Sequence, residues 1–304
     1  MCRMMLVVGE SIVDVVQRPD GTVTEHAGGS PANVAVGLAR LGLETTLAST
    51  IGQDDHGALI RMQLADAGVR LMEGLAVPER TATSTAVLDD EGTPSYTFDL
   101  TWAPGPIPAD LAPDAVHVGS IAAFLQPGSD DVEDLLRRVA PTSVVTFDPN
   151  IRPAMLPARE QVLAHLRQIV PLTDVVQTSL DDLEWLAPGV DPGVVARRWL
   201  EAGPAAVIVT MGARGARIHT PWGSIMVPAA PARVVDTVGA GDAHLAGLLS
   251  ALDDEATLGP DGASELRMVD LAFWRRVGTV AARAAAIAVA RPGSQPPWRD
   301  ELYD

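Results

Sequence analysis

Short apolar runs that alternate with helical segments constrain the fold of this chain more than any other feature. They lie at residues 116–119, 144–147, 175–177 and 206–210, and stretches of helical length separate them. Such alternation is typical of βα units, whose parallel strands form a sheet with helices on both faces. We therefore expect an α/β fold with three layers, α/β/α, around a mostly parallel central sheet.

Two hairpins in the first third of the chain depart from this pattern. Residues 11–17 and 22–26 flank a Pro-Asp-Gly turn, and alternating residues 83–88 and 95–100 flank a second polar turn. A lone hairpin is marginal in water, so we expect the two to pair as a small separate sheet. The chain is then one domain, residues 1–304, with a lid subdomain formed by the insertions 12–27 and 82–102.

The sequence Asp-Thr-Val-Gly-Ala-Gly-Asp at residues 236–242 is the strongest candidate for a reaction centre. We expect a strand at residues 232–235 before it and a helix after it. The helix is indicated by leucines at helical spacing: Leu245, Leu248, Leu249 and Leu252.

The glycines of this stretch suit it to binding an anion. Gly239 and Gly241 allow successive backbone N–H groups, including that of Ala240, to point at one spot at a helix N-terminus. Asp242 beside that spot is suited to accept a proton, and the two together are what phosphorylation of a hydroxyl requires. Taken alone, the same residues also fit a tight turn in which Asp242 only interacts with the helix dipole.

A second glycine-rich stretch, residues 28–33, is predicted to open a buried helix over residues 32–41. Ser30 is expected to be its N-cap, with proline at the first helical position. Asn33 is the only polar side chain in the first turns, so it must find a partner in the backbone or in a ligand. Asp14, in an otherwise apolar strand, either faces solvent or accepts hydrogen bonds from substrate hydroxyls.

Polar residues follow three of the predicted strands, at residues 148–152, 178–182 and 210–215. Each stretch is compatible with ordinary loop chemistry. The carboxyl ends of parallel strands share one edge of a sheet, where ligands bind, so a common site is the simpler explanation. Arg152 is the candidate for a fixed cation there.

The chain contains no lysine, since all 22 basic residues are arginine. This excludes a P-loop, a protein kinase and a pyridoxal-phosphate enzyme, each of which needs a lysine. The net charge of −17 argues against nucleic acid or an anionic membrane as a partner. A single cysteine, no apolar run of membrane length and no metal-ligand spacing among the histidines predict a cytoplasmic protein without disulfides or a histidine-bound metal.

The glycine-rich stretches at residues 28–33 and 236–242 together resemble the paired signatures of the ribokinase-like (PfkB) carbohydrate kinase family. The split hairpins, the order of strands and helices and the chain length agree. Within this family the chain is most similar to bacterial fructokinase-type sugar kinases. The similarity lies in five short sequence stretches, at residues 9–10, 148–153, 181–185, 291–293 and 296–297. The resemblance implies a ribokinase-like fold and an ATP-dependent kinase acting on fructose or a related ketose.

The resemblance also implies a role for each matching residue. Asp242 would take the proton from the attacking sugar hydroxyl, and Gly239, Ala240 and Gly241 would form the anion hole for the γ-phosphate. Sugar hydroxyls would be held by Asp14, Gly29 and Asn33, with Arg152 near the sugar or the phosphoryl group. The ATP and Mg²⁺ side would comprise Ser179, Asp182, Thr210, Gly212 and Gly215.

Two further implications concern ions and assembly. Asp236 is the candidate contact for a monovalent cation such as K⁺ near the anion-hole loop. Lids in the family often pair, so a homodimer is expected, and a small exposed sheet has edges that a partner would cover.

The chain departs from the family's pattern at several positions. Gln177 stands where a lysine is frequent, Asp182 replaces the usual glutamate, and His244 replaces an aromatic residue such as phenylalanine. Residues 96–102, in the second hairpin of this chain, contain no arginine, although many fructokinases carry one there. The shorter side chain of Asp182 weakens the case for its role in binding Mg²⁺. The missing arginine weakens the case for fructose as the substrate.

Two alternatives to a fructokinase remain open from the sequence, and a third is disfavoured. One is a kinase for ribose, a keto-deoxy sugar acid or a nucleoside. Another is a catalytically silent sugar or nucleotide sensor, against which the retained Asp242 argues. The third is a dinucleotide-dependent oxidoreductase, and it is disfavoured because this chain lacks the Gly-x-Gly-x-x-Gly pattern after its first strand.

Overall fold

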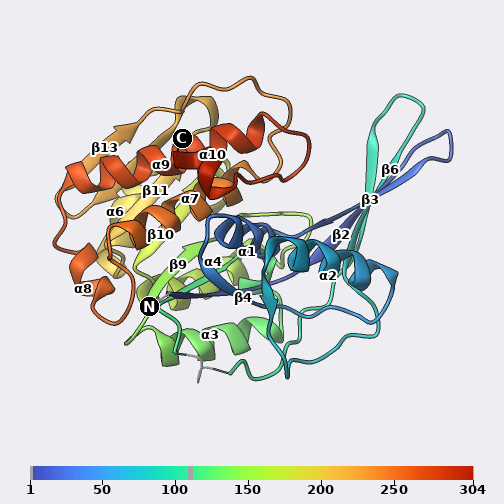
Figure 1. The fold of residues 1–304 in the computed structure, drawn as a ribbon, viewed down its shortest axis with the longest axis horizontal. Helices are drawn as coiled ribbons and strands as arrows, with labels where there is room; N and C mark the ends of the chain where they lie inside the picture. Colours follow the sequence, from blue (N-terminus) through green and yellow to red (C-terminus); the bar gives the residue numbers. More distant parts are fainter. Residues whose placement is uncertain (1–2, 109–111, 304) are drawn as a thin grey trace.

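The computed structural model describes residues 3–108 and 112–303, and within them a nine-stranded sheet forms the centre of the molecule (Figure 1). The strand order is β13-β12-β11-β10-β9-β8-β1-β4-β5. Neighbours pair in parallel except β11 with β12 and β12 with β13. The strands are β1 (Met4–Val8), β4 (Glu44–Ala48), β5 (Arg70–Leu71), β8 (Ala115–Gly119), β9 (Val144–Asp148), β10 (Val175–Ser179), β11 (Ala206–Thr210), β12 (Ala216–Thr220) and β13 (Gly223–Val227).

Helices cover both faces of this sheet, as expected for three layers. Alternate residues of β1 point to opposite sides, so Met5 and Val7 join one apolar cluster while Leu6 and Val8 join the other. The first cluster packs against α1 (Ser30–Arg40), α2 (Asp55–Ala67), α7 (Ala240–Asp254), α8 (Gly262–Leu266), α9 (Leu271–Val289) and α10 (Arg299–Tyr303). The second packs against α3 (Gly128–Val139), α4 (Arg159–Ile169), α5 (Leu180–Leu186) and α6 (Pro192–Ala202).

The two predicted hairpins pair into a separate sheet that projects from the α/β body at the upper right of Figure 1. Its strands are β2 (Ile12–Gln17), β3 (Val23–Gly28), β6 (Thr83–Leu88) and β7 (Pro94–Asp99), in the order β3-β2-β6-β7. The hairpins meet through the parallel pair β2–β6. We call this four-stranded sheet the lid; the exact subdomain limits, 12–27 and 82–102, stay a prediction.

The strand predicted at residues 232–235 is wrong. This segment is irregular, with Val234 and Val235 more than half exposed. The N–H groups of Val235 and Asp236 donate instead to the carbonyl of Val289 at the end of α9 (2.8 and 3.2 Å). The strand propensity of two valines does not decide the structure here, because the backbone donors bind the end of a helix rather than a neighbouring strand.

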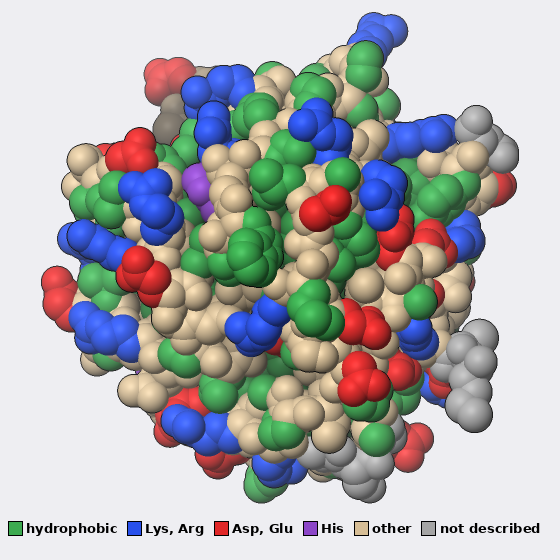
Figure 2. Space-filling model, turned by 90° about the vertical axis from the view of Figure 1, so that its left-hand side faces the viewer, with side chains coloured by type: hydrophobic (Ala, Val, Ile, Leu, Met, Phe, Trp, Pro, Cys, Tyr) green, Lys and Arg blue, Asp and Glu red, His purple; other side chains and the backbone are tan. Residues whose placement is uncertain are grey.

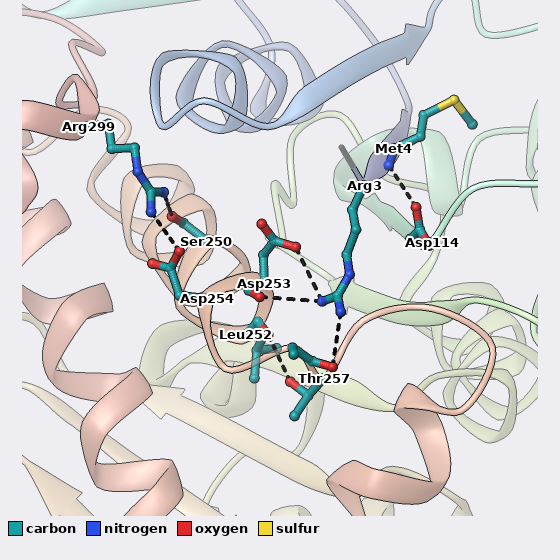
Figure 3. Close-up of polar contacts among 10 residues, drawn as sticks. Arg3, Met4, Asp114, Ser250, Leu252, Asp253, Asp254, Thr257 and Arg299 are labelled. Atoms are coloured by element: carbon teal, nitrogen blue, oxygen red, sulfur yellow. Dashed lines mark hydrogen bonds and ion pairs between the residues drawn. The ribbon is translucent and has the colours of Figure 1, made fainter. Parts of the chain in front are cut away.

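Helix α7 is held at its C-terminal end by two arginines from distant parts of the chain (Figure 3). Arg3 donates to the carbonyl and carboxylate of Asp253 (3.4 and 3.3 Å), and Arg299 donates to Asp254 (2.6 Å). Cations at this end also interact favourably with the helix dipole. These contacts fix the position of α7, whose N-terminal end lies in the cavity described below.

The face opposite the lid carries no single sign of charge. Figure 2 shows arginine and acidic side chains interspersed among apolar ones on that side. None of the helices within residues 3–108 and 112–303 combines the length and apolarity that crossing a bilayer would require.

Candidate active site

A cavity of about 1340 Å³ lies between the lid, the carboxyl ends of β1, β8 and β9, and the N-terminus of α7. This is the edge of a parallel sheet at which ligands are expected. Of the residues singled out from the sequence, those that line it are Asp14, Gly29, Asn33, Arg152, Asp236, Gly239, Ala240, Gly241 and Asp242. Stretches far apart in the chain thus meet in one site.

Asp242 lies in the first turn of α7 and is fixed by two side chains from α1. Ser30 Oγ donates to its Oδ1 (2.6 Å), and Asn33 Nδ2 donates to its Oδ2 (2.8 Å). Burial raises the pKa of Asp242, while both hydrogen bonds and the charge of Arg152 act in the opposite direction. The carboxylate is therefore oriented, and it binds a proton more readily than an exposed aspartate does.

The turn before Asp242 leaves backbone donors available to the cavity. Gly239 is the N-cap of α7 in the left-handed conformation, with φ at 73°. The N–H of Ala240 donates to Thr237 O (3.2 Å), whereas those of Gly239 and Gly241 donate to no group in the described part of the chain. Unpaired donors at a helix N-terminus, reinforced by the helix dipole, form an anion site.

Ser30 does not cap its own helix, contrary to expectation. Gly29 is the N-cap of α1, at φ 97°, and makes no side-chain capping bond. A side chain at Gly29 would meet the carbonyl oxygen of Glu10 at 2.6 Å, so only glycine fits there. The hydroxyl of Ser30 is thereby free to bind Asp242.

Asn33 has one half of its amide engaged and the other half free. Its nitrogen binds Asp242, but its Oδ1 is buried without a partner among residues 3–108 and 112–303. A buried acceptor without a donor is costly, and a ligand hydroxyl would satisfy it. This favours the ligand interpretation of Asn33 over the purely structural one.

Asp14 faces the cavity from the lid. In the sheet register it lies between His26 of β3 and Ser84 of β6, and Ser84 is paired in turn with Phe98 of β7. All four of these residues line the cavity. Burial raises the pKa of Asp14, against the hydrogen bond from Ser84 and the charges of His26 and Arg152. Asp14 is thus on the ligand side of the lid.

Arg152 supplies positive charge opposite Asp14 and Asp242. It is exposed and donates to its neighbour's carbonyl, Ile151 O (3.1 Å). The chain reaches Arg152 through a turn in which Asn150 has a left-handed backbone, with φ at 37°. The N–H of Asn150 donates to Asp148 Oδ1 (2.9 Å) within this turn. The geometry keeps the guanidinium at the cavity with its outer donors unoccupied by the described residues.

Glu10, which is buried, and Asp148, which is partly buried, are acids of the cavity to which we assigned no role from the sequence. Glu10 accepts from Ala122 N (3.1 Å), and burial raises its pKa from 4.5 to about 7. Burial and the nearby charge of Asp182 raise the pKa of Asp148 well above its usual range. The sequence feature that could have identified them is an acidic residue at the end of an apolar strand.

The residues expected on the nucleotide side do not line this cavity. Ser179 and Thr210 end the paired strands β10 and β11 at the same sheet edge, and Gly212 and Gly215 flank the turn into β12. The side chain of Asp182 accepts from Ser179 N and Ile151 N (both 2.8 Å), completing a capping box on α5. Its contacts are those of a helix cap, and its role toward Mg²⁺ stays a prediction.

Asp236 joins two loops beside the anion site. Its carboxylate accepts from Val238 N (3.0 Å) and Gly293 N (2.9 Å), and these bonds lower its pKa. The group is therefore ionised, and each oxygen keeps a further lone pair. An anion of this kind fits a monovalent cation. No cluster of three acidic, histidine or cysteine side chains suited to a metal occurs within the described ranges.

Comparison of sequences gives a consistent result over nearly the whole chain. A family model described as pfkB family carbohydrate kinase matches residues 3–301. A fructokinase of Rhizobium leguminosarum bv. trifolii is 32% identical over 310 residues, which cover 92% of this chain and 94% of that protein.

Solved structures agree with the fold. The fructokinase of Xylella fastidiosa with bound ATP superposes with a TM-score of 0.85 at 25% identity, covering 99% of this chain and 97% of that one. The fructokinase double mutant of Vibrio cholerae O395, bound to fructose, ADP and potassium ion, gives 0.79 at 26% identity over 99% and 97%. The aminoimidazole riboside kinase of Salmonella enterica gives 0.79 at 25% identity over 99% and 98%.

Proposed function

Because this chain belongs to the pfkB family of carbohydrate kinases and is a phosphotransferase, we propose that it phosphorylates a hydroxyl of fructose or a related ketose, using ATP. The observation that carries the proposal is the pairing of Asp242, a partly buried and oriented carboxylate, with free amides at the N-terminus of α7. Both face a cavity that is also lined by Asp14, Gly29 and Asn33, the residues proposed to bind sugar.

The proposed reaction uses Asp242 as the base. The sugar oxygen attacks the γ-phosphorus, the bond to the bridging oxygen of ADP breaks, and the hydroxyl proton passes to Asp242. The transition state is loose, so catalysis consists mainly of alignment and charge neutralisation. The amides of Gly239 and Gly241 and the guanidinium of Arg152 provide that charge stabilisation.

Sugar hydroxyls are proposed to bind between the lid and α1. The Asp14 carboxylate accepts hydrogen bonds from them, and the free Oδ1 of Asn33 accepts another. Gly29 lines the cavity as well, and its backbone is proposed to lie against the sugar.

Two cations are proposed with ATP. Mg²⁺ neutralises charge on the phosphates when it is bound, and no protein ligand is assigned to it beyond the prediction for Asp182. K⁺ is proposed near Asp236, consistent with the potassium ion in the Vibrio cholerae fructokinase. The homodimer and the cytoplasmic location stay predictions.

The proposal is tested by measuring ADP release with Mg-ATP over a panel of ketoses, aldoses, sugar acids and nucleosides. Wild-type protein is compared with Asp242→Asn, which keeps the shape of the side chain. We expect turnover with a ketose and a loss of roughly 10²–10⁴-fold in kcat in the variant. An unchanged melting temperature would show that the loss is chemical.

Two rival functions are distinguished by the same panel. A riboside kinase is favoured by the stacked rings of Tyr96 and Phe98, centroids 6.0 Å apart, which line the cavity from the lid and suit a flat base. Turnover with a nucleoside alone would support it. Binding of ATP and a sugar without any turnover would support a silent sensor.

A further inference from the structure

The side chain of Gln177 connects three groups around the anion site. Its Nε2 donates to Asp148 Oδ2 and to the carbonyl of Gly241 (both 2.9 Å). Its Oε1 lies 2.7 Å from His244 Nδ1. Gln177 is 1% exposed and His244 is 5% exposed, so water does not compete for these bonds. One amide thus links the end of β9 with the first two turns of α7.

These contacts determine the state of both side chains. An amide has two donor hydrogens, and both are used toward oxygen acceptors. The reverse orientation would place the amide oxygen against a carboxylate and a carbonyl, so Oε1 must face His244. That oxygen only accepts, so His244 carries its proton on Nδ1. Burial lowers the pKa of His244 to about 4, which keeps the ring neutral at physiological pH.

We propose that Gln177 and His244 are a positioning pair that holds the anion-site turn of α7 in register with Asp148. The carbonyl of Gly241 belongs to the same turn as the amides of Gly239 and Gly241, so a bond to it fixes where those amides point. His244 prevents rotation of the Gln177 amide by binding its oxygen. This inference rests on the proposed function of the site.

The pair is expected to affect the chemical step more than sugar binding. Neither Gln177 nor His244 lines the cavity, whereas Asn33 of α1 and Asp14 of the lid, which are proposed to bind sugar, do. A displacement of about 1 Å in an aligned site can cost 10²-fold in rate. Loss of the pair should therefore lower kcat and leave the KM for sugar nearly unchanged.

The competing explanation is that His244 only fills space in the core. Leu245 and Leu248 beside it in α7 are buried apolar residues, and an aromatic ring of similar size would then serve equally well. His244→Phe keeps the ring and removes the donor. His244→Asn keeps a donor nitrogen on the same carbon as Nδ1 and removes the ring. The two variants separate filling from hydrogen bonding.

The experiment measures kcat, KM for sugar and melting temperature for both variants and for Gln177→Met. The control is His219→Phe, a buried histidine of β12 outside the cavity. We expect His244→Phe and Gln177→Met each to lower kcat about tenfold or more, and His244→Asn to stay within about threefold of wild type. The double variant should lose no more than the worse single one. Full activity of His244→Phe, or additive losses, would overturn the proposal.

A second readout does not depend on turnover. Nitrogen-15 NMR of histidine-labelled protein should show, from pH 8 to pH 5, a ring with Nδ1 protonated and Nε2 bare whose signal is absent in His244→Phe. A charged ring or the opposite tautomer would contradict the pair even if the enzyme is a kinase. The expected tautomer in a protein without kinase activity would instead remove the proposed function.

Discussion

Ser30 and Asp242 are 212 positions apart in the chain, yet the hydroxyl of Ser30 donates a 2.6 Å hydrogen bond to the carboxylate of Asp242. Asn33 from the same helix binds the other oxygen of that carboxylate. The N-terminal glycine-rich stretch therefore orients the proposed base that the C-terminal stretch supplies. Neither stretch is a complete site alone, and this dependence sets the first prediction.

Ser30→Ala should shift the acid side of the pH–rate profile to higher pH. The Ser30 hydrogen bond lowers the pKa of Asp242, whose burial raises it, so removal of the bond leaves a carboxylate that protonates more easily. A hydrogen bond to a charged group is worth about 1.5–3 kcal/mol, which corresponds to a shift of about one pH unit or more. The measurement is kcat/KM between pH 5 and pH 9.

The matched control for this variant is Ser129→Ala, which removes a buried hydroxyl on α3. It should leave the profile in place. A shift toward lower pH in Ser30→Ala would contradict the assignment of Asp242 as the base.

The wild-type protein should lose stability as the pH rises from 4.5 to 7, and Glu10→Gln should reduce that loss. The folded-state pKa of Glu10 is raised to about 7 from 4.5, so the folded protein binds the proton more tightly than the unfolded chain does. This contribution is fully present below the unfolded value and is lost as pH rises through 7. We expect an effect of about 2–3 kcal/mol, measured by urea unfolding at pH 5 and pH 8. Identical pH dependence in both proteins would exclude the raised pKa.

Gly239→Ala should destabilise the fold, whereas Gly241→Ala should leave its stability nearly unchanged. A Cβ at Gly239 would lie 2.1 Å from Ser294 Oγ, at φ 73°, so we expect a loss of about 1–3 kcal/mol. A Cβ at Gly241 meets nothing within 4 Å, so stability should change by no more than about 0.5 kcal/mol. Gly241→Ala should still lower kcat, because its Cβ enters the space beside the anion site. Full activity would remove Gly241 from that site.

Asp54→Ala should loosen the base of the lid. Asp54 caps α2 through Gly57 N (2.8 Å) and also binds Thr81 N (2.9 Å) and Oγ1 (2.5 Å), two residues before β6. We expect a loss of about 1–2 kcal/mol and a raised KM for sugar. Asp191→Ala, which removes only one capping bond on α6, is the control and should cost less. Equal losses would show that the Thr81 bonds do not stabilise the fold.

ATP hydrolysis without sugar should be slow. Closure of the lid over a bound sugar would exclude water and complete the site, so the γ-phosphate is transferred only when the acceptor is in place. The rates of ADP release with and without the accepted sugar test this directly. Rapid hydrolysis in the absence of sugar would sink the lid's proposed protective role.

The layers and the lid sheet were predictable from the sequence because each rests on local periodicity. Apolar runs such as residues 175–177 lie within buried strands, and the Pro-Asp-Gly turn forces a hairpin. Local signals failed where a tertiary contact competes with them. Two valines at residues 234–235 favoured a strand, but their backbone donates to the end of α9. Strand β12, between two antiparallel neighbours, was missed altogether.

The residues around the candidate site were found more readily than their partners. Glycine and acid spacing identified the turn before Asp242, but nothing local shows that the Ser30 hydroxyl reaches across to it rather than capping its own helix. The bridge from Gln177 to His244 spans 67 positions and is invisible to spacing. Such side chains appeared in the sequence only as departures from a family pattern.

The lid is joined to the α/β body at both ends of each of its hairpins: before Ile12 and after Gly28, and before Thr83 and after Asp99. A flap on one tether can swing and twist in every direction. A sheet held by four connections has less freedom to rotate relative to the body. Asp14 lies on the lid and Asp242 on the body, both at the cavity, so a distance probe between these two positions would report whether the lid approaches the body when ligands bind.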